Sequence, residues 1–154
     1  MLTKVFGRVP EGVTPVPIDF GTQDLNTVLS EYRYHHGQKT FFVWEAVTQY
    51  LTEQGVDTTM GALAQATPGS RLVFTYVRKE LLDGTEFFGA QALYREYRIK
   101  RRLWHFGLNP DQVDEFLSRY GFRSIEQPKV KASRPAASPP TGRGLDVSET
   151  TPRA

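Results

Sequence analysis

The chain has 154 residues, of which 39% are hydrophobic and 23% are charged, and its formal net charge is +2. This composition is typical of one globular domain and unlike that of disordered or fibrous proteins. The absence of cysteine excludes disulfides, thiolate catalysis and cysteine-ligated zinc. No run approaches the roughly 18 apolar residues of a membrane span, and the start lacks the apolar core of a signal peptide. We therefore expect a soluble cytoplasmic protein.

The first elements expected are the end of a helix, an edge strand and a second helix. Apolar residues at helical spacing over residues 2–9 predict a helix end without an N-terminal cap. Residues 13–20 (VTPVPIDF) predict a strand, and Pro15 and Pro17 place it at a sheet edge because neither can donate to a ladder. Thr22 is expected to cap the following helix. The apolar stripe of this helix consists of Leu25, Val28, Leu29 and Tyr32.

The middle of the chain predicts two strands around a helix. Residues 39–45 (KTFFVWE) are nearly continuously apolar, as expected of a strand covered on both faces. Thr52 is placed to cap the next helix, and residues 70–77 (SRLVFTYV) predict the third strand. The buried stripe of the helix is expected to consist of Val56, Met60, Leu63 and Ala64.

The last third predicts two helices, a weaker strand and a tail. Residues 86–103 are expected to form a helix with a basic face, and Asn109-Pro110 begins a second helix that Gly121 ends. Residues 122–127 predict a fourth strand. The order of elements favours an α/β fold with a mostly parallel sheet and helices on both faces. Residues 128–154 lack aromatic residues and are rich in Pro, Ser and Thr, so we expect one domain over residues 1–127 and a mostly disordered tail.

Four stretches occur in an order and spacing that resemble bacterial leucine-carboxyl-methyltransferase-like enzymes. They are VPIDF, TFFVWEAVTQYL, PGSRLVFTYV and LWHFGLNPDQVDEFLSRYGFRSIEQ. The resemblance covers most of residues 1–127 and corresponds to the C-terminal half of this family of class I S-adenosylmethionine-dependent methyltransferases. It implies a partial Rossmann-like class I methyltransferase sheet with helices on both faces, lacking the first two strands.

The resemblance also implies a chain truncated at its N-terminus. The family begins with a strand, a Gly-x-Gly loop and a second strand, whereas only Gly7 and Gly12 precede Asp19 here. In the family's strand order, 3-2-1-4-5-7-6, the absent strands lie between residues 13–20 and 39–45. The edge of residues 39–45 is therefore expected to be exposed, hydrophobic and open to association.

The resemblance places the cofactor S-adenosyl-L-methionine at two strand ends. The family's Asp-Leu or Asp-Phe pair that holds the adenine ring falls on Asp19 and Phe20, and its Glu beside the amino-acid end of the cofactor falls on Glu45. Open α/β sheets bind ligands at such carboxyl ends of strands. The implied reaction is methyl transfer to oxygen, with a carboxylate of a small molecule or protein as acceptor. The implied substrate-pocket residues are Trp44, Tyr50 and Trp104, although packing under the sheet is the favoured role of Trp104, and no catalytic residue is assigned.

Simpler roles stand beside these assignments. Asp19 can instead cap the next turn, and Glu45 can be a solvated residue at the start of a helix. The pair His35-His36 does not predict a metal site, because adjacent helical residues do not share a face.

Two other functions remain open at this point. The chain can be a non-catalytic remnant, or a half-domain that needs a partner. Alternatively, the basic residues 95–102 with Tyr94, Tyr97 and Trp104 can bind nucleic acid through phosphates and base stacking. We disfavour nucleic-acid binding because Glu96 and the acidic residues of 111–115 dilute the basic field.

Overall fold

The computed structural model describes residues 7–127 and 148–150. The chain separates into two compact units, residues 1–35 and 36–154, which we describe one at a time. Most of the helix expected over residues 2–9, and most of the expected tail, lie outside the described residues. The part of residues 2–9 that is described, 7–9, is not helical.

The first unit contains helix α2 (Leu25–Glu31) after a segment without regular structure. The strand predicted over residues 13–20 is wrong, because none of these residues forms a strand. The N-cap predicted at Thr22 is also wrong. Asp24 caps α2, with its carboxylate accepting the N–H of Thr27, while the N–H of Thr22 is already donated to the carbonyl of Asp19 in the preceding turn.

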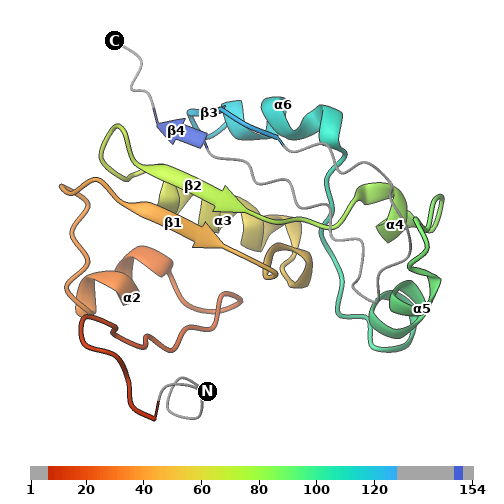
Figure 1. Ribbon diagram of the computed structural model, residues 1–154, viewed down its shortest axis with the longest axis horizontal. Coiled ribbons are helices and arrows are strands. Elements are labelled where there is room, and N and C mark those ends of the chain that lie inside the picture. Colours follow the sequence, from red (N-terminus) through yellow and green to blue (C-terminus); the bar gives the residue numbers. More distant parts are fainter. Residues whose placement is uncertain (1–6, 128–147, 151–154) are drawn as a thin grey trace. The chain divides into compact units, whose positions relative to one another are not determined.

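The second unit is built on a four-stranded sheet of order β1-β2-β4-β3. The strands are β1 (Phe41–Trp44), β2 (Arg71–Phe74), β3 (Phe122–Ser124) and β4 (Ser148–Thr150). Strands β1 and β2 are parallel, and β4 is antiparallel to both β2 and β3 (Figure 1). Strands β1, β2 and β3 confirm, in shorter form, the strands predicted over residues 39–45, 70–77 and 122–127. Strand β4 lies in the segment predicted as tail. The result is a mixed α/β fold, compatible with a methyltransferase-like fold.

One face of β1 and β2 packs on helix α3 (Glu53–Leu63), which lies behind these strands in Figure 1. Thr52 caps α3 as predicted, accepting the N–H of Gly55. The buried side chains of this layer are Trp44, Val56, Met60, Leu72 and Phe74.

The other face of β1 carries Phe41 and Val43, which are 58% and 63% exposed. Within its own unit, β1 is therefore covered on one face, although its continuous apolar sequence predicted cover on both. Alternate side chains of a strand point to opposite faces, so the cover on one face does not extend to the other.

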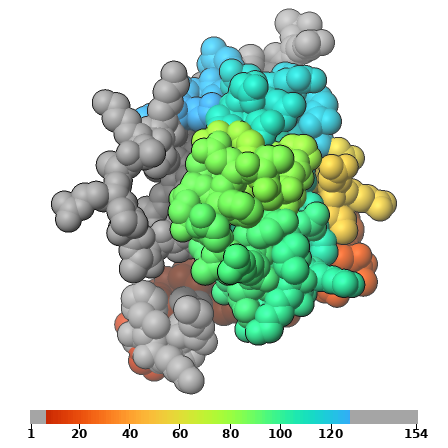
Figure 2. All heavy atoms as spheres, turned by 90° about the vertical axis from the view of Figure 1, so that its right-hand side faces the viewer, coloured from red at the N-terminus to blue at the C-terminus, as the bar shows by residue number. Residues whose placement is uncertain are grey.

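Beyond β2 a small lobe forms from α4 (Lys79–Asp83), α5 (Gln91–Leu93) and the π-helix η2 (Tyr94–Lys100). The helix predicted over residues 86–103 is thus shorter, covering 91–100, because Phe88 and Arg102 adopt positive φ angles on either side of it. Figure 2 shows the lobe as one continuous green to teal surface. Its core consists of Val77, Leu81, Leu82, Ala90 and Trp104.

The last helices are η3 (Pro110–Gln112) and α6 (Val113–Ser118). Asn109 occupies the predicted cap position before Pro110, and Gly121 has the predicted left-handed conformation with φ of 78°. Phe116 of α6 packs on Phe74 of β2, with ring centroids 6.3 Å apart. No described helix is of the length and apolarity that crossing a bilayer requires.

Candidate functional site

The carboxyl end of β1 presents Glu45 on a backbone that turns sharply at the next residue. Glu45 is exposed, and Ala46 has a φ of 56°, in the left-handed region that a residue with a Cβ rarely adopts. The N–H of Ala46 is donated to Oγ1 of Thr75, 2.7 Å away, at the end of β2. Strained residues held by their surroundings cluster at functional sites, so this turn marks the strand end as a candidate site.

Buried polar side chains hold the loop that follows. The hydroxyl of Thr48 is fully buried and donates to the carbonyl of Thr75 at 2.7 Å. The carbonyl of Gln49 accepts the N–H of His105 at 2.7 Å, and Gln49 Nε2 donates to the carbonyl of Ala46. Short helix η1 (Thr48–Tyr50) is therefore tied to β2 and to the segment before α6.

Sequence reasoning missed Ala46, Thr48, Gln49 and Thr75. One signal was available: Thr75 is a polar residue within the apolar run of residues 70–77. A buried hydroxyl needs a hydrogen-bond partner, so a threonine there indicates a fixed polar contact. No sequence signal indicates the positive φ of Ala46, since alanine has no preference for it.

The three expected substrate-pocket residues differ in accessibility. Trp44 is 7% exposed and packs against Phe74, and Trp104 is 5% exposed and stacks on Tyr97 with ring centroids 5.3 Å apart. Tyr50 is 43% exposed. Trp44 and Trp104 thus belong to hydrophobic cores, Tyr50 is open to solvent, and a role for any of them in substrate binding stays a prediction.

Asp19 and Phe20 lie in the first unit, whereas Glu45 lies in the second. The Asp19 carboxylate accepts the N–H of Gly21 at 2.9 Å through Oδ1, and the Asp19 carbonyl accepts the N–H of Gln23. This is the turn-capping geometry that the simpler interpretation of Asp19 predicts. Asp19 is exposed and Phe20 is half-buried, so the turn uses one carboxylate oxygen of an accessible residue.

The basic stretch of residues 95–102 makes several contacts within its own unit. Glu96 forms ion pairs with Lys100 and Arg101, and the hydrogen bond from Arg101 is the main reason that the pKa of the Glu96 carboxyl lies below its usual value. Arg98 donates to the carbonyl of Trp104 at 2.8 Å. These three cations therefore serve local structure, which weakens the case for a nucleic-acid surface. Within residues 7–127 and 148–150, no group of three His, Cys, Asp or Glu side chains is arranged to hold a metal.

The fold and the strand end together define a mixed α/β protein with a candidate ligand site at the carboxyl end of its parallel strands. Residues 1–64 match the family model described as leucine carboxyl methyltransferase, the same family that the sequence motifs resemble. The match covers less than half of the chain and ends after α3. It includes Asp19, Phe20 and Glu45 and stops before Trp104. No curated protein matches the chain.

Proposed function

We propose that this chain binds S-adenosyl-L-methionine and takes part in methyl transfer to a carboxylate oxygen, through Asp19, Phe20 and Glu45. The observation that carries the proposal is the family match, which spans both acids and β1. The exposed position of Glu45, directly after a strand and before the strained turn at Ala46, supports it.

The charges of the two acids fit this cofactor. S-adenosylmethionine carries a sulfonium and an ammonium, and a carboxylate near either cation is favourable. Glu45 forms no ion pair with another residue in the described part of the chain, so its charge is available to a cationic ligand. Asp19 uses one carboxylate oxygen in its turn and can accept a further hydrogen bond.

Each residue then has a separate role. The Asp19 carboxylate would accept from the exocyclic amine of adenine, and the N–H of Phe20 would face a ring nitrogen. Glu45 would lie beside the amino-acid end of the cofactor. When bound, the cofactor supplies a methyl group activated by the positive sulfur.

The protein's contribution is mainly alignment of the two reactants. A carboxylate acceptor is already ionised near pH 7, so it needs no general base. Rigid support of the strand end by Thr48 and Thr75 would keep Glu45 in place during this alignment.

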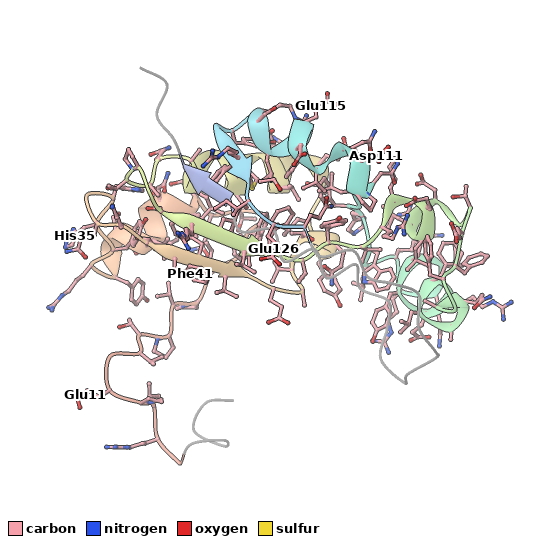
Figure 3. All side chains as sticks on the ribbon, turned by 45° about the horizontal axis from the view of Figure 1, so that its top comes forward. Glu11, His35, Phe41, Asp111, Glu115 and Glu126 are labelled. Carbon is pink, nitrogen blue, oxygen red and sulfur yellow. The ribbon has the colours of Figure 1, made fainter. Side chains whose placement is uncertain are left out.

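Calorimetric titration of the full chain with S-adenosylmethionine and with its demethylated product tests the proposal. We expect saturable binding that Asp19→Ala and Glu45→Gln each weaken by roughly tenfold, as for the loss of a hydrogen bond to a charged group. Glu126→Gln is the matched control, because Glu126, which is labelled in Figure 3, is also exposed and lies outside the matched segment. If a chain shown to be folded binds neither compound, the proposal is overturned and the non-catalytic alternative is favoured.

A further inference from the structure

Strand β1 is the terminal strand of the described sheet. Its ladder to β2 uses the carbonyls of Thr40 and Trp44, which accept the N–H groups of Arg71 and Thr75 at 2.9 and 3.2 Å. In a parallel ladder the backbone groups of alternate residues face alternate sides, so those of Phe41 and Val43 face away from β2. No other described residue pairs with them. Figure 3 labels Phe41 on this outer strand.

The edge lacks the devices that normally protect one. Natural edge strands carry prolines or charges that prevent pairing with another chain. Residues Phe41–Trp44 contain neither, and Phe41 and Val43 are exposed apolar side chains. An open hydrophobic edge of this kind is a template for a further strand.

Two opposite charges flank the strand symmetrically. Lys39 lies three residues before Phe42 and Glu45 lies three residues after it. Both are exposed, and neither forms an ion pair with another described residue. The pattern from residue 39 to 45 is therefore complementary to its own reverse.

We propose that β1 pairs with β1 of a second copy of this chain, antiparallel about a twofold axis at Phe42. This register places Lys39 opposite Glu45 of the second copy, and Phe41 opposite Val43 of the second copy. The twofold axis forms each pair twice. Aromatic with β-branched pairs and pairs of opposite charge are the cross-strand pairs that stabilise antiparallel sheets.

Neighbouring registers are worse for a specific reason. Only odd-numbered residues of this strand direct their backbone groups outward, so an odd-numbered residue must lie opposite an odd-numbered residue of the second copy. The twofold axis can therefore pass through one residue or the next, but not between two residues. An axis at Phe41 puts Lys39 opposite Val43, and an axis at Val43 puts Glu45 opposite Phe41. Each alternative sets a charge against an apolar side chain. The axis at Phe42 instead pairs opposite charges with each other and apolar side chains with each other.

This association does not rest on the methyl-transfer proposal, but both use the Glu45 carboxylate, so its tests are done without cofactor. Sedimentation velocity of the full chain over a concentration series should show a monomer–dimer equilibrium. Lys39→Glu alone and Glu45→Lys alone each turn two attractive pairs into two repulsive ones, so each variant should dimerise about tenfold more weakly.

An equimolar mixture of the two single variants is the sharpest test. Each variant chain carries the charge that the other needs, so the mixture should form a heterodimer at close to the wild-type affinity, and native mass spectrometry with one of the two variants isotopically labelled would identify it. The double variant Lys39→Glu/Glu45→Lys should recover dimerisation on its own. A wild-type chain that stays monomeric or assembles beyond a dimer would overturn the proposal. So would a mixture of the two variants that shows no recovery of dimerisation.

A backbone variant tests the edge itself. The N–H of Val43 faces away from β2, so Val43→Pro should abolish dimerisation while the ladder to β2 persists. Val43→Thr is the matched control, since it keeps the N–H and the β-branched shape, and it should still dimerise. Fluorescence of Trp44 and Trp104 checks folding, and if Val43→Pro is unfolded the charge-exchange mixture still decides the matter.

Discussion

Two segments of similar apolar character, residues 13–20 and residues 39–45, have different structures. The second contains β1, which pairs with β2 in register from Phe41 to Trp44, whereas the first forms no strand. Pro15 and Pro17 remove two donors from the first segment, and the N–H of Val13 is donated to the carbonyl of Pro10 in the nearby turn. A strand needs a ladder partner as well as an apolar sequence, and among the residues that the structure describes the second segment has one in β2.

The acids at the ends of these segments differ in the same way. Asp19 is fixed by Gly21 and Gln23, residues two and four positions away in its own turn. The backbone after Glu45 is fixed by Thr75, which is 29 positions from Ala46 in the sequence. The first site is local, and the second depends on the tertiary structure of its unit.

The largest expected effect compares residues 13–20 with β2, the ladder partner of β1, through their apolar side chains. Leu72 of β2 is fully buried, so Leu72→Ala should lower the free energy of unfolding by about 2–5 kcal/mol. Val13 is 44% exposed, and Val13→Ala should cost less than about 0.5 kcal/mol. Urea denaturation followed by circular dichroism measures both. Equal losses would mean that residues 13–20 are as well packed as β2.

A smaller effect is expected from the tertiary hydrogen bond behind Glu45. Thr48→Val removes a buried donor to the Thr75 carbonyl, and we expect a loss of about 1–3 kcal/mol in the free energy of unfolding. Thr85 also donates its hydroxyl to a backbone carbonyl, that of Glu80, but on the surface. Thr85→Val should therefore cost less than about 0.5 kcal/mol. A Thr48→Val loss no larger than this control would show that the strand end is not held by its buried contacts.

Alkaline pH tests another contact of the second unit, between Tyr120, which follows α6, and Asp57 of α3. Burial and the hydrogen bond to Asp57 raise the pKa of Tyr120 to about 12 from 10.0. The folded chain keeps a proton that the unfolded chain loses, so this stability is fully present below pH 10 and is lost between pH 10 and about 12. We expect about 1–2 kcal/mol to disappear over this range, after allowance for solvent screening. Urea denaturation at several pH values should show a flatter dependence for Tyr120→Phe, and an unchanged slope would contradict the assignment.

The smallest effect concerns backbone strain, which both units contain. Ala46 and Arg33 have φ angles of 56° and 67°, and glycine adopts such angles without a steric penalty. Ala46→Gly and Arg33→Gly should each stabilise the chain by up to about 1 kcal/mol. Thermal denaturation of the two variants compares them directly. A loss of stability in Ala46→Gly alone would mean that the alanine methyl group makes packing contacts that outweigh the strain.

The sequence by itself determined the elements whose signals are local. The apolar runs of β1 and β2, the Thr52 cap of α3, and the Asn109-Pro110 start and Gly121 end around α6 each depend on a few neighbouring residues. The family motifs at Asp19 and Glu45 were equally visible, and the family match covers both.

Only the tertiary structure decided which apolar segments became strands and which polar groups were buried. Strand β4 pairs with β2 and β3 from within a segment whose composition predicts a tail, and the Thr48–Thr75 bond joins residues 27 positions apart. The exposure of Phe41 beside the burial of Trp44 likewise follows from what covers each face of β1. Hydrophobic pattern, caps and turns act over a few residues, whereas ladder partners and buried hydrogen bonds depend on residues that folding alone brings together.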